Sequence, residues 1–82
     1  MPYKRTSVFD QDTLPTALSR DHKTKPGVWG VIHVLEGRLA YTITTPHDEQ
    51  ILEPDVPGII RPEQLHHVQS LGKVRFFVEF HR

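Results

Sequence analysis

The 82-residue chain contains no cysteine. This absence excludes a disulfide framework, a thiolate nucleophile and a thiolate metal site, so any metal would be held by nitrogen and oxygen ligands. The chain also lacks an excess of either charge, because 10 lysine and arginine residues balance 10 aspartate and glutamate residues. Net charge therefore gives no electrostatic argument for binding nucleic acid or an anionic membrane, and we expect neither partner.

Long apolar runs are missing as well. No stretch approaches the roughly 20 apolar residues of a membrane-spanning helix, and residues 1–12 lack the apolar segment of a signal peptide. The sequence therefore favours a cytoplasmic protein that forms one domain over residues 1–82. A chain this short buries only about 60–65% of its surface on folding, so its core is small. A second copy would extend that core, and we expect a homodimer.

What the sequence does contain is the alternation of apolar side chains that β-strands show. Residues 27–41 are apolar on both faces, which predicts a strand covered on both sides. Glu36 and Gly37 interrupt this run with a pair suited to a tight turn, after which 38–45 alternates again. The prediction is a buried hairpin.

Shorter strands are predicted on both sides of this hairpin, at 3–9, 50–53, 59–61, 66–70 and 73–82. One helical or 3₁₀ turn is expected within residues 10–19. Proline and glycine separate the strands, and Leu71-Gly72 reads as the last turn. Many short strands without an amphipathic helix predict an all-β sandwich or barrel.

Three motifs resemble a known family. They are RDHKTKPGVWGVIHVLEGRL at 20–39, PEQLHHV at 62–68 and VRFFVEF at 74–80. Together they resemble the small cupin-like domain of the tellurite-resistance protein B-like family over nearly the whole chain. The resemblance implies a small cupin-like β-barrel of the double-stranded β-helix, or jelly-roll, type, which is often a homodimer. In some members this domain precedes a methyltransferase domain; the present sequence holds only the barrel, so no methyltransferase activity is expected of it.

The wider cupin superfamily implies where a metal would bind. His22 stands at one histidine of the usual His-x-His pair, but Thr24 replaces the second histidine. Gly30 stands where a ligating glutamate is expected. His66, four residues after Pro62, matches the later histidine. The resemblance therefore fills only two of the four usual ligand positions.

Glu79 offers a third ligand if its face of the closing strand points inward. His22, His66 and Glu79 would then form the two-histidine, one-carboxylate set that holds a divalent metal such as zinc, iron, manganese or nickel with open positions. In the alternative interpretation, Glu79 is an outward carboxylate beside Arg75 and His22 is a solvated loop side chain.

Aromatic side chains are the candidates for lining a small-molecule pocket. Trp29, Tyr41 and Phe77 are the residues assigned to this role, with core packing as the alternative. His33, on an otherwise apolar face, is expected to be a core histidine with a satisfied hydrogen bond.

Three functional classes fit these features. The prediction is a small cupin-like metal- or small-molecule-binding protein associated with tellurite or stress response, without demonstrated catalysis. The first alternative is a metal-dependent cupin enzyme of dioxygenase or isomerase type that uses His22, His66 and a carboxylate. The second is a structural interaction domain without a ligand. No Ser-His-Asp set, phosphate-binding glycine loop or paired-carboxylate spacing is present, so catalytic residues stay unassigned.

Overall fold

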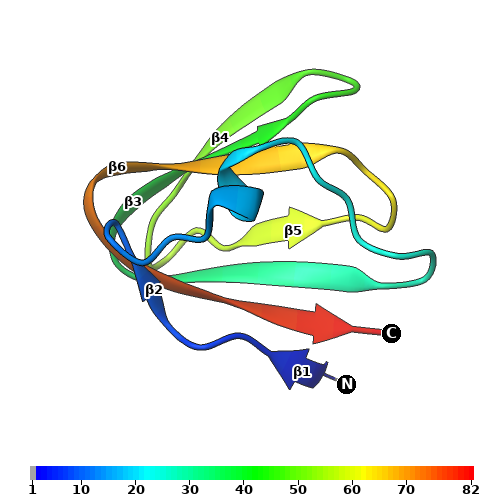
Figure 1. Cartoon of the computed structure of the whole chain (residues 1–82), viewed down its shortest axis with the longest axis horizontal. Helices are drawn as coiled ribbons and strands as arrows, with labels where there is room; N and C mark the ends of the chain where they lie inside the picture. Colours follow the sequence, from blue (N-terminus) through cyan, green and yellow to red (C-terminus); the bar gives the residue numbers. More distant parts are fainter. Residues whose placement is uncertain (1) are drawn as a thin grey trace.

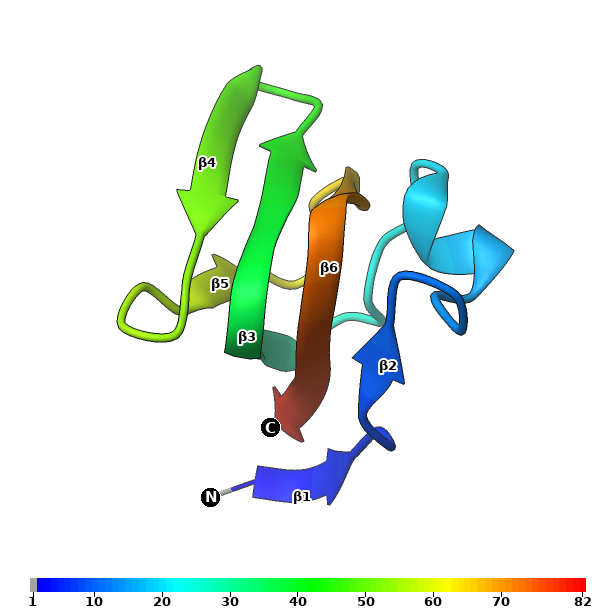
Figure 2. The ribbon, with the colours of Figure 1, turned by 90° about the vertical axis from the view of Figure 1, so that its left-hand side faces the viewer.

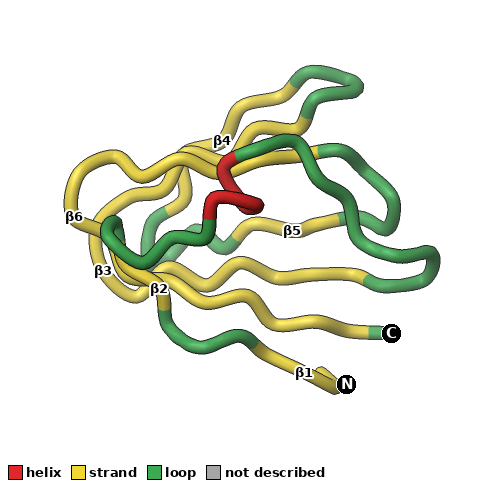
Figure 3. The backbone as a smooth tube through the Cα atoms, viewed as in Figure 1, coloured by secondary structure: helices red, strands yellow, loops and turns green. Residues whose placement is uncertain are grey.

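The computed structural model of the protein describes residues 2–82, and their side chains from residue 4 onward. This part of the chain forms β1 (Pro2–Arg5), β2 (Phe9–Asp10), η1 (Thr16–Ser19), β3 (Trp29–Ile43), β4 (Asp48–Leu52), β5 (Gly58–Ile60) and β6 (His66–His81), where η1 is a 3₁₀ helix. All strand pairs are antiparallel, and loops join them (Figure 3). The predicted all-β class is confirmed. Residues 2–82 include no helix with the length and apolar character needed to cross a bilayer.

Two long strands, β3 and β6, form the centre of the sheet. Their pairing runs from Trp29 opposite His81 to Ile43 opposite His66, which is the full length of β3. The other strands pair with β3 or β6: β1 and β2 with β6, β4 and β5 with β3. Figures 1 and 2 show that β3 and β6 bend together, so that the sheet folds into two arms.

The bend lies where the sequence predicts turns. β3 continues through Gly37 and β6 continues through Gly72, so the predicted hairpin at Glu36-Gly37 and the predicted last turn at Leu71-Gly72 are both wrong. The register of the two strands shifts between Val34 and Glu36 and again after Gly37, as at β-bulges. These irregularities bend the strand pair without ending either strand.

The core lies between the two arms. Even-numbered residues of β6 and alternate residues of β3 face inward, and the buried apolar side chains are Ile32, Val34, Leu39, Tyr41, Ile43, Leu52, Ile60, Val68, Val74, Phe76 and Val78. The alternation predicted along 73–82 is therefore confirmed, and the inward face is the one opposite Glu79, contrary to what the predicted metal set requires. Side chains at 77 and 79 of β6 face outward and are only partly buried.

The folded sheet is not closed into a barrel. The strand order β1-β6-β3-β4 leaves β1 and β4 at opposite ends of the path, and no pairing joins them within residues 2–82. The structure shows an antiparallel folded sheet and does not confirm the closed jelly-roll barrel.

The outward face of β3 is open to solvent within the single chain, contrary to the prediction of cover on both sides. Trp29 is 45% exposed and Leu35 46% exposed, and the neighbouring Ile59 of β5 is 49% exposed. A second copy bound to this face would cover these side chains. The homodimer stays a prediction.

Gly37 and Gly72 provide a matched pair for testing the bend. Both have positive φ, 79° and 83° respectively, a conformation that costs alanine about 1–2 kcal/mol. A Cβ at Gly37 would also overlap the backbone carbonyl of Lys73, whereas a Cβ at Gly72 would meet no atom within 4 Å. Urea unfolding should therefore show a loss of about 3 kcal/mol or more for Gly37→Ala and about 1 kcal/mol for Gly72→Ala. Equal losses would contradict the requirement for close approach at Gly37.

Candidate functional site

His22 and His66 face each other across an antiparallel bridge. The backbone N–H of each donates to the carbonyl oxygen of the other at 2.9 Å. Residues paired in this way point their side chains to the same face. The two imidazole rings consequently lie together, with their centroids 4.1 Å apart. The loop before β3 is thereby fixed to the start of β6.

Backbone carbonyls orient both rings. The Nδ1 atom of His66 lies 2.8 Å from the carbonyl oxygen of Gln64, and that of His22 lies 2.9 Å from the carbonyl oxygen of Arg20. A carbonyl oxygen only accepts, so each Nδ1 carries the hydrogen and donates it. The Nε2 atom of His66 is buried and has no hydrogen-bond partner within the described residues.

Burial keeps the His66 ring neutral. The side chain is 1% exposed, and desolvation lowers its pKa, while the hydrogen bond to Gln64 acts in the opposite direction. The nearby His22 and His67 also lower the pKa of His66, and Asp21 raises it. In the neutral ring Nε2 holds a lone pair, because Nδ1 has the proton.

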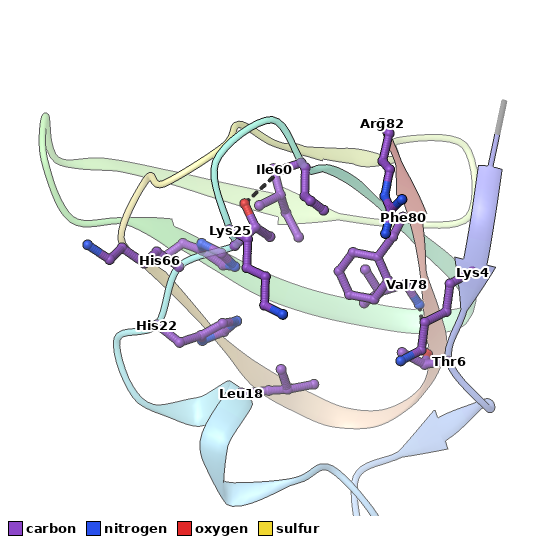
Figure 4. A pocket seen from close by; sticks show the side chains of 13 residues that line it. Lys4, Thr6, Leu18, His22, Lys25, Ile60, His66, Val78, Phe80 and Arg82 are labelled. Carbon is purple, nitrogen blue, oxygen red and sulfur yellow. Dashed lines mark hydrogen bonds between the residues drawn. The ribbon is translucent and has the colours of Figure 1, made fainter.

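A cavity of about 360 Å³ opens beside this histidine pair. The apolar part of its lining is Leu18, Val28, Ile60, Val78 and Phe80. The basic part consists of Lys4, Lys23, Lys25, Arg82, His22 and His66. No aspartate or glutamate among the described residues lines it. Figure 4 shows Lys4 and Arg82 across the cavity from the two histidines.

Strand register explains how the cavity is assembled. Lys4 of β1 pairs with Phe80 of β6, so both side chains lie on the inward side of the sheet. Gly30 of β3 pairs with Phe80 on one side and with Ile60 of β5 on the other. A Cβ at Gly30 would lie 2.9 Å from Cδ1 of Ile60. Ile60 therefore occupies the space beside the position where the cupin resemblance predicted a glutamate ligand.

Glu79 does not join the two histidines. It lies on the outward face of β6, where its Oε1 atom is 3.2 Å from Nε2 of His33 and 3.3 Å from Nε2 of His81. Hydrogen bonding from His33 is the main cause of its lowered pKa. The predicted set of His22, His66 and Glu79 is thus divided between two faces of the sheet.

No group of three or more histidine, cysteine, aspartate or glutamate side chains within the described residues could hold a metal. Two imidazoles among cationic side chains fall short of the three protein ligands of a typical catalytic metal site. Metal binding by His22 and His66 stays a prediction. His33, predicted to be a core residue, instead lies on the outward face and stacks on Phe77 at a centroid distance of 4.9 Å.

The three aromatic residues assigned to a small-molecule pocket do not line the cavity. Tyr41 is fully buried in the core, where its hydroxyl donates to the carbonyl of Ile59 at 2.9 Å and burial raises its pKa to about 12. Trp29 and Phe77 lie on the outward face. Tyr41 therefore follows the alternative interpretation of core packing, and Trp29 and Phe77 belong to a different surface.

The lysine and arginine residues of the cavity were not found from the sequence. Lys23 and Lys25 lie next to His22 in a charged loop, which is the only local signal for them. Lys4 and Arg82 come from opposite ends of the sequence, and only the pairing of β1 with β6 brings them to one cavity. Pairing of such distant segments cannot be read from side-chain alternation alone.

Residues 4–78 match the family described as TehB-like domain. The chain belongs to this family. The relationship to tellurite-resistance protein B that the motifs predicted is thereby confirmed, and the cupin description is not shown. A curated relative, "Probable S-adenosyl-L-methionine-dependent methyltransferase TehB" from Haemophilus influenzae (strain Rd), is 36% identical over 76 residues. The match covers 85% of the TehB-like chain and 26% of that relative. A second curated TehB, from H. influenzae strain 10810, is 35% identical over the same length.

Solved structures show the same fold. The crystal structure of TehB from H. influenzae has a TM-score of 0.88 and 30% identity, over 98% of the TehB-like chain and 30% of that protein. A protein from Escherichia coli K12 also has a TM-score of 0.88, with 19% identity, and 87% of it is covered. At that identity the likeness concerns the fold alone.

These relatives correct the functional prediction. The predicted function, a small cupin-like metal- or small-molecule-binding protein associated with tellurite or stress response and without demonstrated catalysis, is wrong, because the curated relatives are named as probable S-adenosyl-L-methionine-dependent methyltransferases. The match concerns one part of proteins with that name. The TehB-like chain spans about a quarter of the length of those relatives, 26% in each case.

The lowered pKa of His66 predicts a loss of stability on acidification. In the unfolded chain a histidine takes up a proton near pH 6.5 (about its ordinary pKa), whereas the buried ring does so only at lower pH. The unfolded state then binds more protons, so the free energy of unfolding falls as the pH falls below about 6.5 and continues to fall until the folded pKa is reached.

His66→Asn tests this linkage, because asparagine keeps an N–H donor for the Gln64 carbonyl but does not titrate. The free energy of unfolding is measured by urea unfolding at about pH 7.5 and about pH 5.5. Its fall between these two pH values should be smaller for His66→Asn than for the unmodified chain. His47→Asn, at an exposed position, is the control. Its free energy of unfolding should fall by as much as that of the unmodified chain. If all three proteins lost stability equally, the assignment to His66 would be refuted.

Proposed function

We propose that this TehB-like domain is an accessory domain of S-adenosylmethionine-dependent methyl transfer. Its role is to work together with a methyltransferase domain. The observation that carries the proposal is the match of 85% of the chain to about a quarter (26%) of a protein named as a probable methyltransferase. The likeness of fold to the crystal structure of TehB, at a TM-score of 0.88, supports it.

The chemistry of the cavity supports an accessory role. S-adenosylmethionine carries a positively charged sulfonium and has a net positive charge at neutral pH. The cavity presents Lys4, Lys25 and Arg82, and no aspartate or glutamate side chain among the described residues lines it. Like charges repel, so the lining of the cavity does not favour the methyl donor. We therefore place the donor site outside the described residues and the role of the TehB-like domain beside it.

The cupin-like description of the fold belongs to this proposal as well. Two sheet arms with a cavity between them are consistent with a cupin-related architecture, although the sheet is open. In this interpretation the TehB-like domain keeps the arrangement of the cupin fold, while Ile60 occupies the space next to one ligand position.

A domain exchange tests the proposed function. The TehB-like region of H. influenzae TehB is replaced by residues 4–78 of this chain, and methyl transfer is followed as released S-adenosylhomocysteine. We expect the chimera to keep activity within about threefold of TehB, and TehB without its TehB-like region to lose about tenfold or more. The physical reason is that the two sheets share one fold and the exchange leaves the methyltransferase region unchanged.

Binding of S-adenosylhomocysteine to each protein is the control for folding of the methyltransferase region. A chimera that binds S-adenosylhomocysteine normally but is no more active than the deletion would refute the proposal for this chain. Full activity of the deletion would refute an accessory role for the domain.

A further inference from the structure

We propose that the cavity beside His22 and His66 is a binding site for a small organic anion. The negatively charged group, a carboxylate or a phosphate monoester, binds at the basic side of the cavity, and an apolar body packs on its floor. This inference rests on the lining of the cavity and does not depend on the proposed function in methyl transfer.

The charges of the lining are the first argument. Lys4 and Lys25 form no ion pair within the described residues. Asp21 lies next to His22 in the chain, but it accepts hydrogen bonds from Nδ1 of His67 and from Oγ1 of Thr44, both at 2.8 Å. Asp21 does not line the cavity. The ammonium groups are therefore left without a carboxylate partner in a protein whose net charge is zero.

The positions of the basic groups are the second argument. Lys4 comes from β1, Lys25 from the loop before β3, and Arg82 follows β6, so three separate elements bring positive charge to one cavity. In Figure 4 the Lys25 ammonium points into the space between the histidines and Lys4. Oxygens of a single anionic group placed there can meet more than one charged donor, and such hydrogen bonds are stronger than neutral ones.

The apolar floor of the cavity determines which chemical character the uncharged part of the ligand should have. Val28, Ile60, Val78 and Phe80 offer an apolar surface below the charged groups. A small inorganic anion would leave this surface uncovered, whereas an apolar body would remove it from water. The volume of about 360 Å³ lies within the range of small-ligand pockets. The same lining excludes cationic ligands.

Three ligands of nearly equal shape test the charge requirement: benzoate, benzamide and benzamidine, which are negative, neutral and positive at neutral pH. The full 82-residue chain is titrated with each in low salt with EDTA, and binding is followed by ¹H–¹⁵N chemical shifts. We expect benzoate to bind about tenfold or more tightly than benzamide, and benzamidine to show no saturable binding. Added salt should weaken the binding of benzoate and leave the binding of benzamide unchanged.

Two lysine substitutions locate the site. Lys25→Met removes one charge from the cavity lining and should weaken benzoate about tenfold. Lys73→Met removes the same charge from an exposed position of β6 outside the cavity and should change the affinity less than twofold (roughly). Benzoate should change the amide chemical shifts of residues 24, 60, 78 and 80, which line the cavity. The spectra of both variants without ligand should stay dispersed, which shows that the variants are folded.

Three results would overturn the inference. The first is equal affinity for benzoate and benzamide, which would mean that charge plays no part. The second is an equal effect of Lys25→Met and Lys73→Met, which would mean that the anion binds through overall charge. The third is that the shifts caused by benzoate lie on the outward face around Trp29 instead of at the cavity.

Discussion

The continuous pairing of β3 with β6 is the interaction on which the rest of the structure depends. Every other strand pairs with one of these two, and both arms of the folded sheet contain a part of each. Because the two strands stay paired through the bend, the inward side chains of both arms meet in one core. A chain of 82 residues can in this way bury a core without a second sheet.

The same pairing determines where the cavity lies. At the end of the arms away from the bend, β1 and the loop before β3 approach the inward faces of β5 and β6. The bridge between His22 and His66 fixes that loop, and Gly30 leaves room for Ile60. Charged side chains from the edge strand and the loop therefore come to lie over apolar side chains from the centre of the sheet, which gives the cavity both of its chemical characters.

Sequence reasoning succeeded where the signal was local. Alternation along residues 73–82 separated the two faces of β6 correctly, because side chains of a strand point to opposite faces in turn, but it did not show which face is inward. It failed at Gly37 and Gly72, since a glycine with positive φ is equally suitable for a hairpin turn and for a bulge within a strand. Only the long-range pairing of β3 with β6 separates these two cases. The same limit explains which residues of the site were predicted. His22 and His66 were found through family resemblance, whereas the position of Lys4 at the cavity depends on a strand pairing that the neighbouring sequence does not reveal.

The charges around the histidine pair bear differently on the two kinds of ligand considered for it, a metal ion and the proposed anion. Both Nδ1 atoms donate to backbone carbonyls, an arrangement that also orients metal-binding histidines. Glu79, the carboxylate that would have balanced a metal charge, is on the other face of the sheet. A divalent cation beside Lys4 and Lys25 would meet only positive charge from that side, whereas an anion would be attracted by both. The position of the rings alone is compatible with a metal ion, whereas the charges of Lys4 and Lys25 support the proposed anion.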